Sequence, residues 1–250
     1  MASFQTQIMG LTDLSISSSG TNPTEAQLTQ FLTDGAKEVI NQLPGHLLPL
    51  CSSSQTFTSG SADTLTTGKI LNVFRSDGDI NQPCRKIPAK QKGRVSDPEE
   101  MSYATITDPV FFIDNNSLDV LPSGGSCSYS EVQYPAVAYS ADAITTFPDE
   151  AEHLVVLYGA VKSLQNVLGS MNSSIVHSDQ DGSYSASSSS SQGWEKVRDY
   201  IQSDEDVELS GASLSSLSSE MQQFVVEYQW YEKQQAKLQS DYEKGLQALS

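Results

Sequence analysis

The C-terminal segment, residues 212–249, constrains the fold of this chain more than any other stretch. Large, mostly apolar side chains recur there at alternating steps of three and four residues, which places them along one side of an α-helix. The positions on this side are Leu214, Leu217, Met221, Phe224, Tyr228, Tyr231, Gln235, Leu238, Tyr242, Gly245 and Leu249. They form a heptad seam with two imperfect positions, Gln235 and Gly245. A seam of this length must be covered, so the sequence predicts a long helix packed against other helices.

The seam leaves two kinds of partner open. The helix can pack within the bundle of its own subunit, or it can form a helix–helix interface between subunits. Tyrosines favour an interface, because these large and stiff side chains tolerate partial exposure. The subunit-interface candidates are Phe224, Tyr228, Tyr231, Leu238 and Tyr242.

A second helix is predicted in the segment "NPTEAQLTQFLTDGAKEVINQLPG". Asn22 is expected to cap it, Pro23 suits its first turn, and Glu25 follows Asn22 at capping-box spacing. The expected buried stripe consists of Leu28, Phe31, Leu32, Val39, Ile40 and Leu43. The pair Pro44-Gly45 is expected to end the helix.

The segment "ITTFPDEAEHLVVLYGAVKSLQNVLG" predicts a third helix, over residues 148–169. Pro148 fits the first turn, and Thr145 or Thr146 can cap it. Acidic residues then stand at the positive end of the helix dipole. His153 has no second histidine four residues away, so the zinc-binding pattern H-E-x-x-H is absent. We therefore interpret the stretch as a capped structural helix with His153 on its surface.

Between residues 52 and 140 the helical period gives way to alternation. The runs "QTFTSG", "KILNVFRS", "PVFFIDNNSLDVLP" and "SYSEVQYPAVAYS" are short and rich in β-branched or aromatic residues. Turn residues separate them at Asp77-Gly78, at Asn115-Asn116 and at positions 123–125. This pattern predicts an antiparallel β-meander, with "SDPEEMSYA" as a candidate short helix crossing it.

Together these segments predict an α+β fold, in which a helical bundle carries an inserted antiparallel β-meander. Residues 1–22 are expected to form a flexible arm, and residues 23–250 a single domain. Within that domain we expect the β-rich insertion at 52–140, a Ser-rich flexible loop at 170–193 and the C-terminal helix at 212–249. The segment "GWEKVRDYIQ" is a candidate short helix after the loop.

Composition limits the classes of partner. The formal net charge is −17, so the chain is a poor candidate for gripping nucleic acid or an anionic membrane, although DNA can slide past such a surface. No stretch approaches the roughly twenty apolar residues that span a bilayer, and the N-terminus lacks the features of a secretion signal. Cys51, Cys84 and Cys127 show no C-x-x-C spacing, which disfavours a disulfide scaffold or a zinc knuckle and indicates a reducing compartment.

One basic cluster stands out in this acidic chain. The segment "CRKIPAKQKGR" supplies Arg85, Lys86, Lys90, Lys92 and Arg94. Three interpretations are open: a solvated loop, a docking patch for an acidic neighbouring subunit, or a contact with DNA.

No catalytic, cofactor or metal site is predicted. His46, His153 and His177 are far apart and belong to no motif, and the chain contains neither a nucleophile elbow nor a phosphate-binding loop. The stretch "SDQDGS" resembles calcium ligands but lacks the full spacing and the distal glutamate. The stretch "SGGSCS" is explained as a turn between strands. The chain is therefore expected not to be an enzyme.

The order of these segments resembles the structural proteins of tailed bacteriophages, in particular head–tail connector, adaptor or neck proteins. The resemblance rests on the helix "TEAQLTQFLTDGAKEVINQLP", the strand "YPAVAYS" that leads into the "FPDE" helix, and the closing helix "EMQQFVVEYQWYEKQQAKLQSDYEKGLQAL". It covers roughly residues 24–168 and 214–249.

The resemblance implies a virion protein, made in the host cytoplasm, that forms a homo-oligomeric ring, commonly of twelve subunits. Its expected partners are the portal protein, other neck or tail proteins, and double-stranded DNA that passes through the lumen without sequence-specific binding. Two rivals remain. The chain can be another virion component, such as a tail-completion or baseplate protein, or a phage-encoded enzyme or metal-binding domain.

Overall fold

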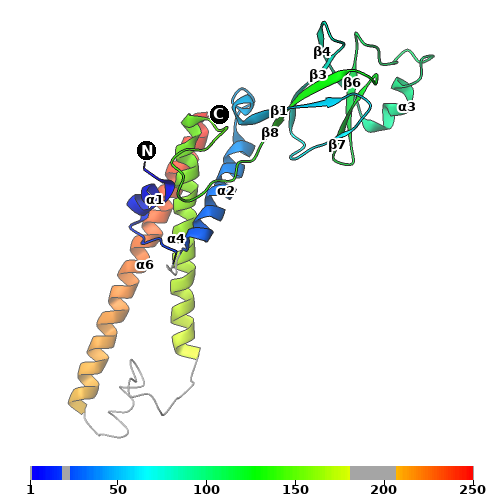
Figure 1. The fold of residues 1–250 in the computed structure, drawn as a ribbon. Helices are drawn as coiled ribbons and strands as arrows, with labels where there is room; N and C mark the ends of the chain where they lie inside the picture. Colours follow the sequence, from blue (N-terminus) through cyan, green and yellow to red (C-terminus); the bar gives the residue numbers. More distant parts are fainter. Residues whose placement is uncertain (1, 19–22, 181–206, 250) are drawn as a thin grey trace. The chain divides into compact units, whose positions relative to one another are not determined.

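The computed structural model describes residues 2–18, 23–180 and 207–249. In this part of the chain the fold is α+β, as expected, with five helices and two four-stranded, mostly antiparallel sheets (Figure 1). The chain divides into two compact units. The first unit contains residues 32–156 and the chain ends, up to Phe4 and from Gly245. The second contains residues 5–31 and 157–244.

The first unit contains both sheets. One sheet has the strand order β1-β8-β3-β4, from Ser52–Thr58, Ser126–Val132, Ile70–Ser76 and Asn81–Pro83. The other has the order β2-β7-β6-β5, from Asp63–Thr64, Ser117–Leu121, Val110–Asp114 and Arg85–Lys86. All pairs are antiparallel except β5 with β6. The insertion is mostly antiparallel, as expected, but its strands are not all neighbours in chain order, because β8 lies between β1 and β3. Alternation defines the two faces of a strand but does not select its neighbour.

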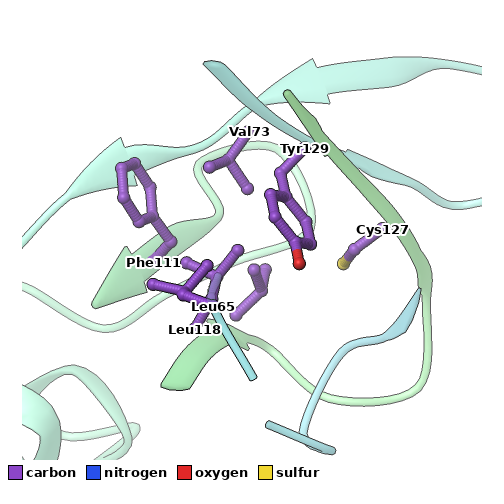
Figure 2. Close-up of a cluster of buried hydrophobic side chains, with 7 residues drawn as sticks. Leu65, Val73, Phe111, Leu118, Cys127 and Tyr129 are labelled. Carbon is purple, nitrogen blue, oxygen red and sulfur yellow. The ribbon is translucent and has the colours of Figure 1, made fainter. Parts of the chain in front are cut away.

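The two sheets share one apolar core (Figure 2). Val73, Cys127 and Tyr129 come from the first sheet, and Phe111 and Leu118 from the second. The successive inward positions on β8 are two residues apart, as the pleat of a strand requires. The phenylalanine that follows on β6 belongs to a second cluster, with Ile87, Val95, Ala104 and Val110. Strand β6 is thus apolar on both faces, which explains its unbroken "VFF" run.

Short helical segments accompany the strands. A 3-10 helix at Leu48–Cys51 precedes β1, and another at Ala89–Gln91 leads into α3, Lys92–Val95. The short helix expected in "SDPEEMSYA" is wrong: residues 96–104 form turns, and Ala104 N–H donates to the carbonyl of Val95 at 2.9 Å. The aspartate and proline at the start of that segment favour turns over a helix interior.

The turn between β6 and β7 confirms the interpretation of the Asn-Asn pair. Asn115 and Asn116 both have positive φ, 47° and 58°, which a two-residue hairpin turn requires and asparagine tolerates. Gly78 and Gly124, at two of the other predicted turns, also have positive φ, 111° and 89°.

Helix α4, Asp149–Gln180, begins next to the predicted position and runs further. Of the two expected caps, Thr146 donates its hydroxyl to the carbonyl of Thr145 at 2.7 Å, and ahead of the helix the backbone N–H of Ile144 donates to Oε1 of Glu152 at 2.6 Å. Because the helix continues to Gln180, residues 170–180 are helical where a loop was expected. The rest of the predicted Ser-rich loop and the short helix "GWEKVRDYIQ" lie outside the described residues.

Helix α2, Glu25–Gln42, confirms the second predicted helix but has a different cap. Gln27 N–H donates to Thr24 Oγ1 at 3.2 Å, and Thr24 N–H donates to Gln27 Oε1 at 2.9 Å. This reciprocal pair is a capping box two residues further along the chain than expected, while Asn22 lies outside the described residues.

The N-terminal residues differ most from the prediction of a flexible arm. Residues Phe4–Thr12 form helix α1, in which Phe4 and Ile8 are fully buried. Within the second unit, Gln5 Nε2 donates to the carbonyl of Ile16 at 2.8 Å. Gln234 Nε2, on helix α6 (Val207–Leu249), donates to the carbonyl of Leu11 at 2.9 Å. The serine content of the segment obscured the apolar positions that anchor it.

Candidate functional site

The predicted seam of α6 faces inward along its described C-terminal half. Leu238 is buried, with 3% of its surface exposed. Phe224, Tyr228, Tyr231 and Tyr242 are half-buried. In the second unit the ring of Tyr242 lies 5.9 Å from that of Tyr158 on α4. Intrachain packing, one of the two alternatives, therefore accounts for much of the described seam; Leu214, Leu217 and Met221 have no described side chains.

The imperfect seam position Gly245 has a structural reason in the first unit. A methyl group built on Gly245 would overlap Cδ2 of Leu154, a fully buried side chain on α4. The glycine therefore permits the two helices to approach closely. His153, on the same turn of α4, is exposed, and its Nδ1 lies 2.9 Å from the carbonyl oxygen of Glu150. These contacts agree with the interpretation of His153 as a helix-surface residue.

The large apolar side chains that α6 leaves exposed lie outside the seam. Val225, Val226 and Trp230 are 49%, 67% and 45% exposed, and we call them the α6 strip. Trp230 packs edge-on against Tyr231, with ring centroids 5.1 Å apart. These three positions do not follow the heptad spacing of the seam, so the periodicity of the sequence did not indicate the strip.

A hollow of about 550 Å³ borders the α6 strip within the second unit. It is lined by Asp13, Ser219, Gln222, Gln223, Val226, Glu227, Trp230 and Tyr231. Burial and the neighbouring carboxylate of Glu227 raise the pKa of Tyr231. The lining of the hollow combines the apolar or aromatic side chains of Val226, Trp230 and Tyr231 with the carboxylates of Asp13 and Glu227.

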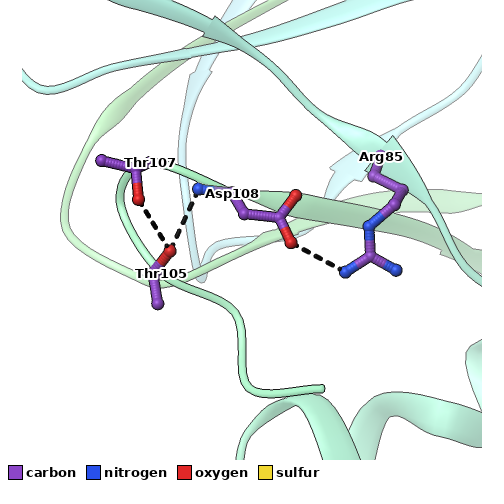
Figure 3. A network of polar contacts seen from close by, with 4 residues as sticks. All are labelled: Arg85, Thr105, Thr107 and Asp108. Carbon is purple, nitrogen blue, oxygen red and sulfur yellow. Dashed lines mark hydrogen bonds and ion pairs between the residues drawn. The ribbon is translucent and has the colours of Figure 1, made fainter. Parts of the chain in front are cut away.

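The predicted basic cluster is largely neutralised by its own unit. Arg85 Nη2 lies 3.0 Å from Asp108 Oδ2, and Thr105 Oγ1 accepts the backbone N–H of that aspartate (Figure 3). Arg94 forms an ion pair with Glu100 at 3.1 Å. Exposed pairs of this kind contribute about 0–1 kcal/mol each to stability, so their main effect is to cancel charge.

Lys92 is held by two contacts. Its Nζ lies 3.6 Å from Oδ2 of Asp119 and 5.0 Å from the ring centroid of Phe112. Lys86 and Lys90 are exposed and have no ion-pair partner among the residues that the structure describes. Three of the five predicted docking or DNA-facing cations are thus engaged within the chain.

Glu131 is a buried carboxylate that sequence reasoning did not single out. Its side chain on β8 accepts the backbone N–H groups of Thr66, Thr67 and Gly68 at 3.2, 2.5 and 2.8 Å. Burial acts to raise the pKa of Glu131, but these donors outweigh burial and lower it. The carboxylate fixes the loop between β2 and β3, and the "TTG" sequence of that loop is the only signal that could have indicated the contact.

The cysteines and the candidate metal ligands of the described residues were compared with the requirements of redox and metal sites. The three cysteines are free, and burial raises the pKa of Cys51 to about 11 and that of Cys84 to about 12. Within the described ranges, His, Cys, Asp and Glu side chains form no cluster of three or more that could hold a metal ion. Over the same ranges, no helix has the length and apolar character needed to cross a membrane.

Comparison with known proteins adds no family to these observations. No protein-family model matches the chain, and a search of curated proteins found no match.

Proposed function

We propose that this chain is a structural protein of a tailed-bacteriophage virion and that its copies form a ring at the head–tail junction. The ring would join the portal protein to the tail and let double-stranded DNA pass through its lumen. We expect the ring to contain about twelve copies of the chain. The copies would be made in the host cytoplasm, and the ring would contact other neck or tail proteins. The proposal assigns no catalytic residue, cofactor or metal.

The α6 strip is the observation that carries the proposal. Val226 and Trp230 expose large apolar surfaces on a helix whose seam is already occupied within the chain. Such a surface is typical of a protein–protein interface. The seam of α6 packs within its own chain, so the strip remains available to contact a neighbouring subunit. If that contact is head-to-tail, it can close into a ring.

The charge distribution supports the passage of DNA better than its capture. The net charge is −17, and three residues of the basic cluster, Arg85, Lys92 and Arg94, are already paired with carboxylates. A surface of this kind repels the phosphate backbone and releases few counterions.

The mass of the purified protein, alone and mixed with its cognate portal, tests the proposal. Light scattering and negative-stain imaging should detect rings with a fixed multiple of the 27.1 kDa chain, alone or only on the portal. Val226→Glu places a charge on the strip and should abolish rings. Ala236→Glu adds the same charge to an exposed position ten residues along α6 and should leave them intact.

If the protein stays monomeric and does not bind the portal, the proposal is overturned. Assembly with a different subunit count, at another position in the particle, would instead favour a tail-completion or baseplate protein. If Val226→Glu forms rings as well as Ala236→Glu does, the α6 strip is not the interface between subunits.

A further inference from the structure

The strongest remaining feature of the molecule is a buried arginine at one end of the two-sheet core. Arg75 lies on β3, is 4% exposed, and donates from Nε to the carbonyl of Pro122 at 3.0 Å. Its Nη1 atom is buried and has no hydrogen-bond partner. Among the described residues no carboxylate forms an ion pair with it. A buried charge in this condition is costly unless an anion compensates it.

Arg75 also lines a cavity. The space measures about 410 Å³ and is bordered by Arg75, Ser76, Asp77, Gly78, Ile106, Gly124, Gly125 and Ser126. A Cβ built on Gly125 would lie 2.6 Å from Cζ and 2.7 Å from Nη2 of Arg75. Glycine at this position is therefore what leaves room for the guanidinium beside the backbone.

Asp77, the acidic residue of the cavity lining, forms no ion pair with Arg75, although the arginine is among the groups that lower the pKa of this carboxyl. Asp77 is exposed in the turn after β3, and its Oδ1 accepts the backbone N–H groups of Asp79 and Ile80, each at 3.2 Å. One of its two carboxylate oxygens is thus engaged in the turn. Asp77 also adds negative charge to the rim of the cavity, which disfavours a dianion more than a monoanion.

We infer that the cavity beside Arg75 binds a carboxylate group supplied by a ligand. Nη1 of this guanidinium lacks a hydrogen-bond partner, and a carboxylate oxygen is the acceptor that forms a charge-assisted hydrogen bond with such a group. Ser76 and Ser126 add hydroxyl groups, and Ile106, 49% exposed, supplies an apolar wall for the carbon attached to the carboxylate. The source can be a small free carboxylate or an acidic side chain of another protein. The inference is independent of the proposed ring.

Thermal unfolding of the full chain in matched salts tests this site, whatever the oligomeric state. Sodium acetate should raise the Tm above that in sodium chloride of equal ionic strength, because a ligand that binds only the folded state stabilises it. Sodium phosphate should have a smaller effect. Ile106→Asp adds a negative charge at the wall and should weaken acetate binding roughly tenfold. Met101→Asp, at a fully exposed position outside the cavity lining, should leave the acetate effect unchanged.

Equal effects of acetate and chloride in the wild type would overturn the inference, as would equal acetate effects in Ile106→Asp and Met101→Asp. A larger effect of phosphate, lost in Ile106→Asp, would overturn the choice of a carboxylate. Arg75→Met should abolish the acetate effect. If that variant does not fold, the comparison of Ile106→Asp with Met101→Asp still decides.

The source of the carboxylate is resolved with amide-capped peptides. A five-residue peptide with one central glutamate among alanines is compared with the same peptide carrying glutamine. Tighter binding of the glutamate peptide than of acetate supports a protein-borne carboxylate, whereas equal binding supports a small free carboxylate. Equal binding of the two peptides and no acetate effect would overturn both.

Discussion

Gly245 on α6 lies directly against Leu154 on α4, and a methyl group on the glycine would also come within 3.3 Å of His153 Nε2. A seam position that the sequence marks as a defect is thus a point of close helix approach. Replacing Gly245 with a larger residue should destabilise the fold, because the added atoms would overfill a closely packed contact.

Gly245→Ala is expected to lower the free energy of unfolding by about 1–3 kcal/mol, because the added methyl overpacks the contact with Leu154. Urea denaturation checks this value. Gly211→Ala on the same helix is the matched control: a Cβ there meets no atom within 4 Å, and alanine is a better helix former by about 1 kcal/mol. Stabilisation by both substitutions would show that the helices do not approach at Gly245.

Glu131→Gln is expected to destabilise the protein at neutral pH by about 1–3 kcal/mol, because it weakens the bonds to the backbone of Thr67 and Gly68. The pKa of Glu131 is lower in the folded chain than its ordinary value of 4.5. Its contribution is therefore present above that value and lost as the pH falls through the folded pKa. Denaturation curves at a series of pH values should show the wild type and the variant converging in acid.

The control for Glu131 is Glu99→Gln, at an exposed position, which should change stability by no more than about 0.5 kcal/mol. A gap between wild type and Glu131→Gln that stays constant down to strongly acidic pH would contradict the assigned role of the carboxylate.

Thr24→Ala is expected to cost about 0.5–2 kcal/mol, because it removes the hydroxyl that accepts Gln27 N–H at the start of α2. Thr24→Ser retains the hydroxyl and should stay close to the wild type. Thermal and urea unfolding measure both variants. If Thr24→Ala and Thr24→Ser behave alike, the reciprocal pair does not cap the helix.

The buried thiols should react slowly in the folded protein. A rise of the Cys51 pKa from 9.0 to about 11 leaves roughly a hundredfold less thiolate at a given pH below 9, since each pKa unit is a factor of ten. Alkylation followed by mass spectrometry at pH 8 should find Cys51 and Cys84 protected natively and modified in urea. Rapid native modification of Cys51 would contradict its burial.

Local patterns predicted the helices well and the tertiary contacts poorly. The seam from Phe224 to Tyr242 and the turn at Asn115-Asn116 depend on neighbours a few residues apart, so spacing and backbone preference were sufficient. Helix α1 escaped prediction because its anchors, such as Ile8, stand among polar residues and are fixed by distant packing. The Glu131 contact and the Arg75 cavity join residues far apart in the chain, which no local pattern encodes.

The register of β1 with β8 pairs Ser52 with Val132, the first residue of one strand with the last of the other. Cα atoms paired in this way lie roughly 4.5–5.5 Å apart. The chain therefore enters and leaves this set of strands at neighbouring points, with about eighty residues, 53–131, between them. Such a module can grow, shrink or be exchanged during evolution without changing the separation of the helical segments that flank it. The sequences of the two sheets can therefore diverge while the chain segments on either side of them stay close together.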